Sequence, residues 1–166
     1  MSIVEPEIVT VGISDLKIAA KPNRLRTSGL GSCIGLVIYD SVNKTAGMVH
    51  IMLPDSSFSK TSELNKAKYA DTAVQYLVEM LESAGCEKSS LLAKMAGGSE
   101  MFKFSYQPEI MRIGPRNVEA VKNNLSLLNI PIVSSDTGGT NGRTIEFDMD
   151  TENLTIRTVT QGVKVI

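Results

Sequence analysis

The sequence predicts an α+β fold, a layered α/β sandwich of mostly antiparallel strands with two main helices. Short apolar runs rich in β-branched residues recur along the chain and are separated by brief turns, which favours hairpins over a parallel, doubly wound sheet. Only two segments repeat their apolar residues at the three- and four-residue spacing of an amphipathic helix. No repeat, low-complexity segment or polar linker divides the 166 residues, so we expect a single domain over 1–166.

Strands dominate the first third of the chain. Residues 7–19 predict one or two strands, which the Lys-Pro-Asn triplet at 21–23 ends. The almost continuous apolar run at 33–39 predicts a buried strand. A turn at 41–44 leads into 45–53, which we interpret as the returning strand of a hairpin.

Two apolar stripes predict the helices. The first stripe follows a polar, serine-rich loop at 55–65 and repeats through 70–81, with Gly85 placed to cap the C-terminus of the helix. The second helix begins near Pro115, because proline suits the first turn of a helix. Its buried face is predicted to consist of Val118, Val121, Leu125 and Leu128.

Short strands fill the rest of the chain. Residues 90–96 predict a strand that leads into a pair of glycines, and 110–114 and 130–133 predict two more. The Asp-Thr-Gly-Gly sequence at 136–139 is typical of a tight turn. Residues 143–160 alternate on both sides of a polar centre, which predicts a second hairpin.

Composition narrows the class of protein. The 17 basic and 18 acidic residues give a net charge of −1, which argues against a dedicated nucleic-acid-binding protein. No apolar run approaches the roughly 18 residues of a membrane span, and the N-terminus does not resemble a signal peptide. We therefore expect a cytoplasmic protein without direct membrane insertion. One histidine and two cysteines form a poor set of zinc ligands, so neither a metal nor a cofactor is expected.

Cys33 and His50 are the candidate catalytic residues. A cysteine hydrolase needs a thiolate, a base that generates it, and hydrogen-bond donors for the oxyanion. Glycines before Cys33 leave the backbone open, so the amides of Ser32 and Cys33 are candidate oxyanion donors. If the hairpin pairs Asp40 with Thr45, His50 becomes a diagonal neighbour of Cys33 on the same face. A turn with an odd number of residues would place the two side chains on opposite faces.

A structural interpretation of the same residues stays open on the pattern alone. A free cysteine in an apolar strand is usually a small buried hydrophobic residue. A lone histidine in the run at 48–53 is also more often a core residue than a catalyst. An unperturbed cysteine is mostly thiol at neutral pH, so catalysis depends on a base beside it.

Six motifs in a fixed order carry a family resemblance. They are TSGLGSCIGLVIYD, GMVHIMLPD, KYAD, AKMAGGSEMF, IGPRNVEAV and DTGG. Together they resemble the CheD family of chemoreceptor glutamine deamidases, over about residues 8–160. The resemblance implies hydrolysis of glutamine side-chain amides on methyl-accepting chemoreceptors to glutamate, with release of ammonia through a cysteine thioester.

The resemblance also implies particular residues and partners. The family's Cys–His–Thr triad falls on Cys33, His50 and Thr27, with Thr27 orienting the imidazole through its hydroxyl or its carbonyl. The fold is expected to be similar to the catalytic domain of cytotoxic necrotizing factor toxins. The implied partners are chemoreceptors and the phosphatase CheC, and the protein is expected to be recruited to chemoreceptor arrays.

Other residues are weaker candidates. Met101 and Phe102 follow a glycine pair and either form an apolar edge that holds a partner helix or pack into the core. Cys86 is expected to be structural, and Arg116 and Asn117 to make structural contacts. Two other functions stay open: an adaptor that binds receptors and CheC with little turnover, and a different thiol hydrolase such as a peptidase or transglutaminase.

Overall fold

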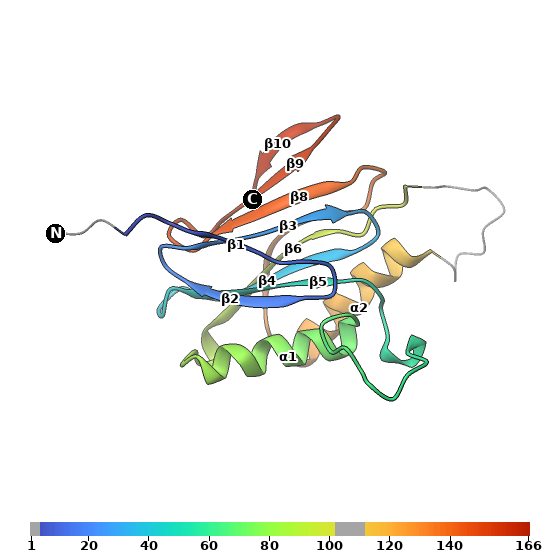
Figure 1. Cartoon of the computed structure of the whole chain (residues 1–166), viewed down its shortest axis with the longest axis horizontal. Helices are drawn as coiled ribbons and strands as arrows, with labels where there is room; N and C mark the ends of the chain where they lie inside the picture. Colours follow the sequence, from blue (N-terminus) through green and yellow to red (C-terminus); the bar gives the residue numbers. More distant parts are fainter. Residues whose placement is uncertain (1–3, 102–111) are drawn as a thin grey trace.

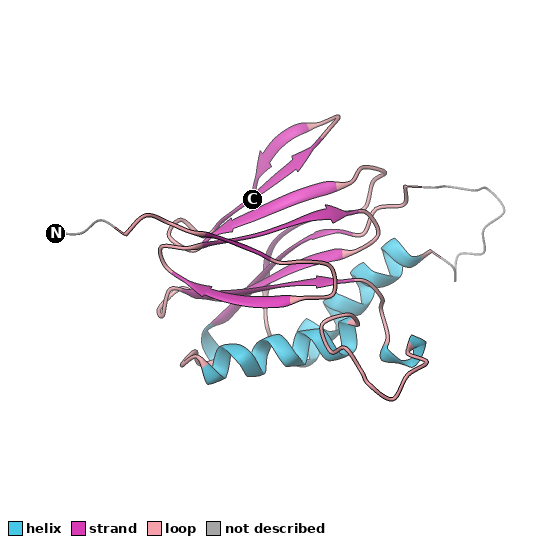
Figure 2. Ribbon diagram, in the orientation of Figure 1, coloured by secondary structure: helices cyan, strands magenta, loops and turns pink. Residues whose placement is uncertain are grey.

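The structure is a computed structural model that describes residues 4–101 and 112–166. Within these ranges, two five-stranded sheets face each other, and two helices cover the outer side of one sheet (Figures 1 and 2). The predicted layered α+β architecture is confirmed. None of the helices in the described part of the chain is long and apolar enough to cross a bilayer.

The first sheet has its outer face free of helices. Its strand order is β1-β3-β8-β9-β10, and β1 runs parallel to β3 while the other neighbours are antiparallel. The second sheet lies between the first sheet and the helices. Its order is β2-β5-β4-β6-β7, with β6 and β7 parallel and the other neighbours antiparallel. The prediction of mostly antiparallel strands is therefore confirmed for the described residues.

The bounds of the strands follow the apolar runs closely in the second sheet. The first sheet consists of β1 Ile8–Thr10, β3 Arg24–Leu30, β8 Arg143–Asp148, β9 Asn153–Thr158 and β10 Gly162–Val165. The second consists of β2 Leu16–Ala20, β4 Ile34–Asp40, β5 Thr45–Ile51, β6 Leu91–Gly97 and β7 Ile132–Thr137.

Both helices lie where their apolar stripes predict them. Helix α1 spans Ala70–Ser83, and Gly85, at a φ of +99°, caps it by donating to the Glu82 carbonyl. Helix α2 spans Ile113–Leu127 and has Pro115 in its first turn. Two short 3₁₀ helices, η1 Ser56–Phe58 and η2 Lys88–Ser90, lie in the connections before α1 and β6.

Two apolar cores hold the layers together. One lies between the helices and the second sheet, and the other lies between the two sheets. Every residue of β4 and β5 is buried, because these central strands contribute one face to each core. Their burial on both sides explains why the sequence shows near-continuous apolar runs there instead of an alternating pattern.

The structure corrects four predictions. The first is the tight turn at 136–139, because Asp136 and Thr137 are the last residues of β7 and only the two glycines lie beyond the strand. The range 24–30 was assigned no strand, yet it forms β3, whose alternating burial reflects one face on the inter-sheet core and one in solvent. The exposed edge strand β10 was also missed. The strand predicted at 110–114 is wrong for its three described residues, because Arg112 is the N-cap of α2 and the next two residues begin the helix. Residues 110–111 lie outside the described residues.

Candidate active site

The register of the β4–β5 hairpin decides whether Cys33 and His50 share a face. The turn between the strands pairs Asp40 with Thr45, as predicted, and pairs Gly35 with His50. Cys33 lies two residues before Gly35, so it is a diagonal neighbour of His50 in this register. Diagonal Cβ atoms are about 7–8 Å apart or somewhat less in a regular ladder. The predicted register is confirmed.

The shared face is the one between the two sheets. Cys33 packs against the inter-sheet core and is partly exposed, whereas the side chain of His50 is fully buried. Thr27 reaches across from β3 in the opposite sheet and places its hydroxyl 2.7 Å from Nδ1 of His50. The structure thus brings Thr27 into contact with His50, on the side of the hairpin where the register places Cys33.

The Thr27 hydroxyl sets the tautomer of His50. The hydroxyl oxygen also lies 2.7 Å from the carbonyl oxygen of Val11, which only accepts hydrogen bonds. The single hydroxyl proton therefore points to Val11, and the oxygen accepts a hydrogen bond from the Nδ1–H of His50. The imidazole consequently carries its proton on Nδ1 and a lone pair on Nε2.

The Nε2 atom is the nitrogen that a general base must present. It is buried, and no group in the described ranges forms a hydrogen bond with it. A buried polar atom without a partner is unfavourable by about 1–3 kcal/mol, which makes such an atom uncommon in a purely structural histidine. Its lone pair is the acceptor that the thiol proton of a neighbouring cysteine requires.

Burial shifts the pKa of both candidate catalytic groups toward the neutral form. Desolvation raises the pKa of the Cys33 thiol above its ordinary value, and it lowers the pKa of His50 below its ordinary value. Both shifts oppose a resting thiolate–imidazolium ion pair, because each favours the neutral form of its group. The arrangement suits proton transfer to His50 during the attack on a substrate.

Two backbone hydrogen bonds hold the segment before β4. The Ser99 amide donates to the Gly31 carbonyl at 2.9 Å, and the Gly98 amide donates to the Cys33 carbonyl at 3.0 Å. A regular antiparallel ladder would return a bond from Cys33 to Gly98, but Gly97 and Gly98 have positive φ angles and the return bond is not formed. A Cβ on Gly97 would also clash with the Cys33 carbonyl oxygen.

The amides of Ser32 and Cys33 have no acceptor among the described residues. Because the C=O and N–H of one peptide point in opposite directions, the bond from Ser99 to the Gly31 carbonyl turns the Ser32 N–H away from Ser99. Across the described ranges, no group accepts a hydrogen bond from the Ser32 or Cys33 N–H. Free, adjacent amides next to the candidate nucleophile are what an oxyanion hole requires.

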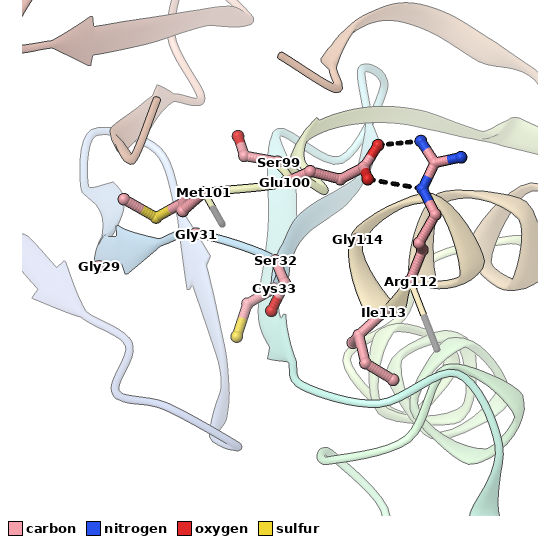
Figure 3. A pocket seen from close by; sticks show the side chains of 10 residues that line it. All are labelled: Gly29, Gly31, Ser32, Cys33, Ser99, Glu100, Met101, Arg112, Ile113 and Gly114. Carbon is pink, nitrogen blue, oxygen red and sulfur yellow. Dashed lines mark hydrogen bonds and ion pairs between the residues drawn. The ribbon is translucent and has the colours of Figure 1, made fainter. Parts of the chain in front are cut away.

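A pocket of about 410 Å³ opens at Cys33. Figure 3 shows the Cys33 side chain with Met101 on one side and Ile113 on the other. An ion pair between Glu100 and Arg112 closes one end, and the Arg112 Nε atom lies 2.5 Å from the Glu100 carboxylate. His50 does not line the pocket. Of the two candidate catalytic side chains, only that of Cys33 is reached from this pocket.

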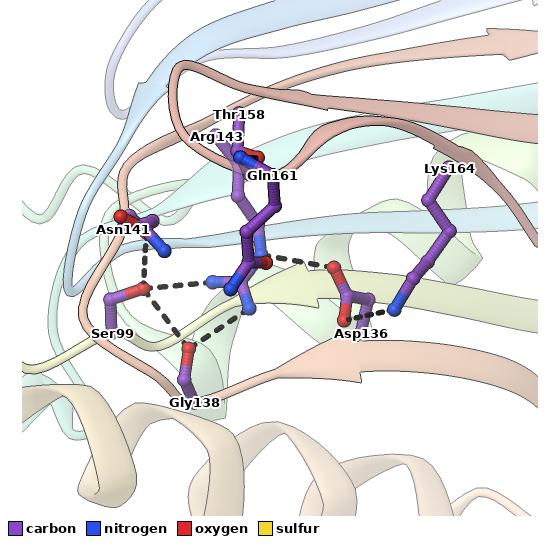
Figure 4. Close-up of polar contacts among 8 residues, drawn as sticks. All are labelled: Ser99, Asp136, Gly138, Asn141, Arg143, Thr158, Gln161 and Lys164. Atoms are coloured by element: carbon purple, nitrogen blue, oxygen red, sulfur yellow. Dashed lines mark hydrogen bonds and ion pairs between the residues drawn. The ribbon is translucent and has the colours of Figure 1, made fainter.

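A buried arginine supports the wall of this pocket. Arg143 donates 2.8 Å to the Ser99 hydroxyl and 2.9 Å to the Gly138 carbonyl, and it pairs with Asp136 at 3.2 Å (Figure 4). Lys164 pairs with the other oxygen of Asp136. This network holds the segment whose Ser99 amide binds the Gly31 carbonyl. Sequence reasoning did not find Arg143, although an arginine at an inward position of an alternating strand was the available signal.

The structure places the weaker candidate residues in different environments. Met101 lines the pocket and is 50% exposed, so it is not packed in the core. Phe102 lies outside the described residues. Cys86 is buried in the core beneath the helices, as a structural cysteine would be. Within the two described ranges, no three His, Cys, Asp or Glu side chains gather as they would around a metal ion.

Comparisons with known proteins extend over the whole chain. The family model described as CheD chemotactic sensory transduction matches residues 52–158, which is more than half of the chain. The chemoreceptor glutamine deamidase CheD of Bacillus licheniformis is 63% identical over 168 aligned residues, and the match covers both chains completely. The relative of the same name from Bacillus subtilis is 62% identical over 166 residues, again with complete coverage of both.

A relative with lower sequence identity carries the same name. The chemoreceptor glutamine deamidase CheD of Halalkalibacterium halodurans is 56% identical over 160 residues, which cover 96% of this chain and 99% of the relative. The chain belongs to the CheD family.

Proposed function

We propose that this protein is a chemoreceptor glutamine deamidase that uses Cys33 as its nucleophile and His50 as its base. The relatives that match it along its full length carry that activity in their names. The observation that carries the assignment of residues is the Val11–Thr27–His50 chain of hydrogen bonds, which leaves an unpaired Nε2 lone pair on the face that Cys33 shares.

The reaction begins with transfer of the Cys33 thiol proton to Nε2 of His50. The sulfur attacks the carboxamide carbon of the substrate glutamine, and the carbonyl oxygen becomes an oxyanion that the Ser32 and Cys33 amides stabilise. The imidazolium then gives its proton to the leaving nitrogen, so that ammonia departs and a thioester remains. Thr27 keeps Nδ1–H in place while the positive charge forms and disappears.

Hydrolysis of the thioester uses the same groups. His50 takes a proton from water, the hydroxide attacks the thioester carbon, and the Cys33 thiol is regenerated as glutamate forms. A threonine hydroxyl is neutral, so it stabilises the imidazolium less than the aspartate of a serine protease would. This difference favours slow, regulated modification of receptors over rapid turnover.

The rim of the Cys33 pocket offers a surface for receptors and for CheC. The exposed side chain of Met101 beside the Cys33 pocket suits contact with a helix of a receptor or of CheC. The same site would then serve two partners, and CheC would compete with receptors for it. A cytoplasmic location with recruitment to chemoreceptor arrays follows from this substrate. A fold similar to the catalytic domain of cytotoxic necrotizing factor toxins is part of the same proposal.

Mass spectrometry tests the proposed activity. Incubation with cytoplasmic receptor fragments should add about one dalton at particular glutamines, the mass change that converts an amide to a carboxylate. Cys33→Ala should abolish this gain, while Cys86→Ala should leave it unchanged, because Cys86 lies in the other core. A gain that persists in Cys33→Ala removes Cys33 as the nucleophile. Receptor binding without any gain in the wild-type protein would favour the adaptor alternative.

A further inference from the structure

Asn117 connects the ends of the two strands beside the candidate active site. It lies near the start of α2 and is fully buried. Its Nδ2 atom donates to the Ser32 carbonyl and to the Met52 carbonyl, both at 2.9 Å. Ser32 directly precedes Cys33, and Met52 follows His50 by two residues. One amide group thus joins the chain next to the nucleophile to the chain next to the base.

The orientation of this amide follows from its neighbours. Both contacted atoms are carbonyl oxygens, so only the nitrogen of Asn117 satisfies them. Its Oδ1 atom is buried and has no hydrogen-bond partner within the described ranges. An unpaired buried acceptor is unfavourable, so the two hydrogen bonds of the Nδ2 atom offset this loss. The position thus retains a polar side chain for its two hydrogen bonds.

The bond to Ser32 acts on one candidate oxyanion donor. The Ser32 carbonyl and the Cys33 N–H belong to the same peptide and point in opposite directions. The carbonyls of Gly31 and Cys33 are held by the backbone amides of Ser99 and Gly98, whereas the Ser32 carbonyl is held by the Asn117 side chain. A single substitution at this position therefore releases this peptide and the Met52 carbonyl, while the bonds to the Gly31 and Cys33 carbonyls remain.

We infer that Asn117 is a positioning residue for deamidation, which holds the Ser32–Cys33 peptide so that the Cys33 N–H faces the oxyanion. The inference rests on the proposed function and adds to it a side chain that touches neither the substrate nor the thiol. An amide that rotates out of place loses its contact with the charge of the transition state but leaves the thiol and imidazole intact. The predicted defect is accordingly in kcat and not in thiol reactivity.

Two rates measured on the same variants test this inference. Asn117→Ala should lower kcat for deamidation of a receptor fragment about a hundredfold with little change in KM. The rate at which iodoacetamide alkylates Cys33 should change less than about twofold, because alkylation forms no oxyanion. Asn117→Ser is the second variant in case the alanine protein does not fold. Asn124→Ala is the matched control, since its amide donates within α2 to the Ala120 carbonyl.

The outcomes separate this inference from the proposed function. A kcat within about threefold of wild type in a folded Asn117 variant overturns the inference. An equal loss of kcat and of alkylation rate also overturns it, because the defect would then lie in the Cys33–His50 pair. Both results leave the proposed function standing when Cys33→Ala is inactive. Deamidation by Cys33→Ala would instead refute the proposed function.

Discussion

Replacement of Thr27 by valine tests the contact that orients the candidate base. Valine keeps nearly the shape of threonine and removes its hydroxyl. In the structure this hydroxyl is fully buried, accepts from Nδ1 of His50 and donates to the Val11 carbonyl, both at 2.7 Å. The variant leaves two buried groups without partners. Each is unfavourable by about 1–3 kcal/mol, so we expect the free energy of unfolding to fall by about 2–6 kcal/mol.

The effect on catalysis follows from the tautomer. Without Thr27 nothing holds the proton on Nδ1, and an imidazole with its proton on Nε2 cannot accept a proton from Cys33. The wrong tautomer lowers kcat about 10⁴-fold in a serine protease triad, where the orienting group is a carboxylate. A neutral hydroxyl orients the ring less strongly, so we expect a loss of about 10²-fold. KM should stay the same, because Thr27 does not line the pocket.

The assay is deamidation of a receptor fragment, followed by mass spectrometry at several substrate concentrations. Thr27→Ser keeps the hydroxyl and should retain most of the activity. Thr45→Val is the matched control, because it removes a threonine hydroxyl whose bond goes to Asn43 at the far end of the hairpin. A folded Thr27→Val protein with kcat within about twofold of wild type would refute the proposed role of the hydroxyl.

Three further predictions concern protonation and backbone space. Because burial raises the pKa of Cys33, its alkylation by iodoacetamide should reach half of its maximal rate above about pH 8.5, and a midpoint below pH 7 would indicate a resting ion pair instead. Because burial lowers the pKa of His50, the folded protein binds fewer protons than the unfolded chain just below the unfolded pKa. The free energy of unfolding should therefore fall as the pH drops through about 6.5, and His50→Gln should reduce this dependence in urea titrations. Gly97→Ala should lower the free energy of unfolding by about 2 kcal/mol or more, because its φ is +120° and the Cβ meets the Cys33 carbonyl. Gly12→Ala, with open space around it, should change the same thermal or urea measurement by less than about 1 kcal/mol.

The strands and helices with a strong apolar signal were predictable. Helix α1 and the β4–β5 hairpin follow from apolar periodicity and from the continuous runs of the central strands. Strand β3 was missed because RLRTSGL places polar residues on a solvent face and ends in small residues. The start of α2 was missed because Ile113 looks like strand when its neighbours in space are unknown. Local patterns identify an element only where its burial is regular.

The candidate site was predictable to a similar degree. Cys33 and His50 follow from residue type, spacing and an assumed register, which the Asp40–Thr45 pair confirms. Their chemical roles stay predictions, as does the role of Thr27. The backbone groups that contact the site could not be predicted from the sequence. Every residue has a backbone carbonyl, so the residue type does not reveal that the Val11 carbonyl accepts a hydrogen bond. Asn117 was expected to make structural contacts, and its two acceptors became visible only in the structure.

The sequence by itself determined the family, the layered α+β class and the hairpin that joins the two candidate catalytic residues. These depend on local periodicity and on the order of motifs, and both can be recognised in the sequence without knowledge of the structure. Only the tertiary structure decided which nitrogen of His50 is free, because that depends on Thr27 from the other sheet and on Val11 beyond it. It also decided the direction in which burial shifts the two pKa values, upward for Cys33 and downward for His50. Protonation depends on the desolvation and hydrogen bonds that distant segments impose, and these exist only once the two sheets have packed together.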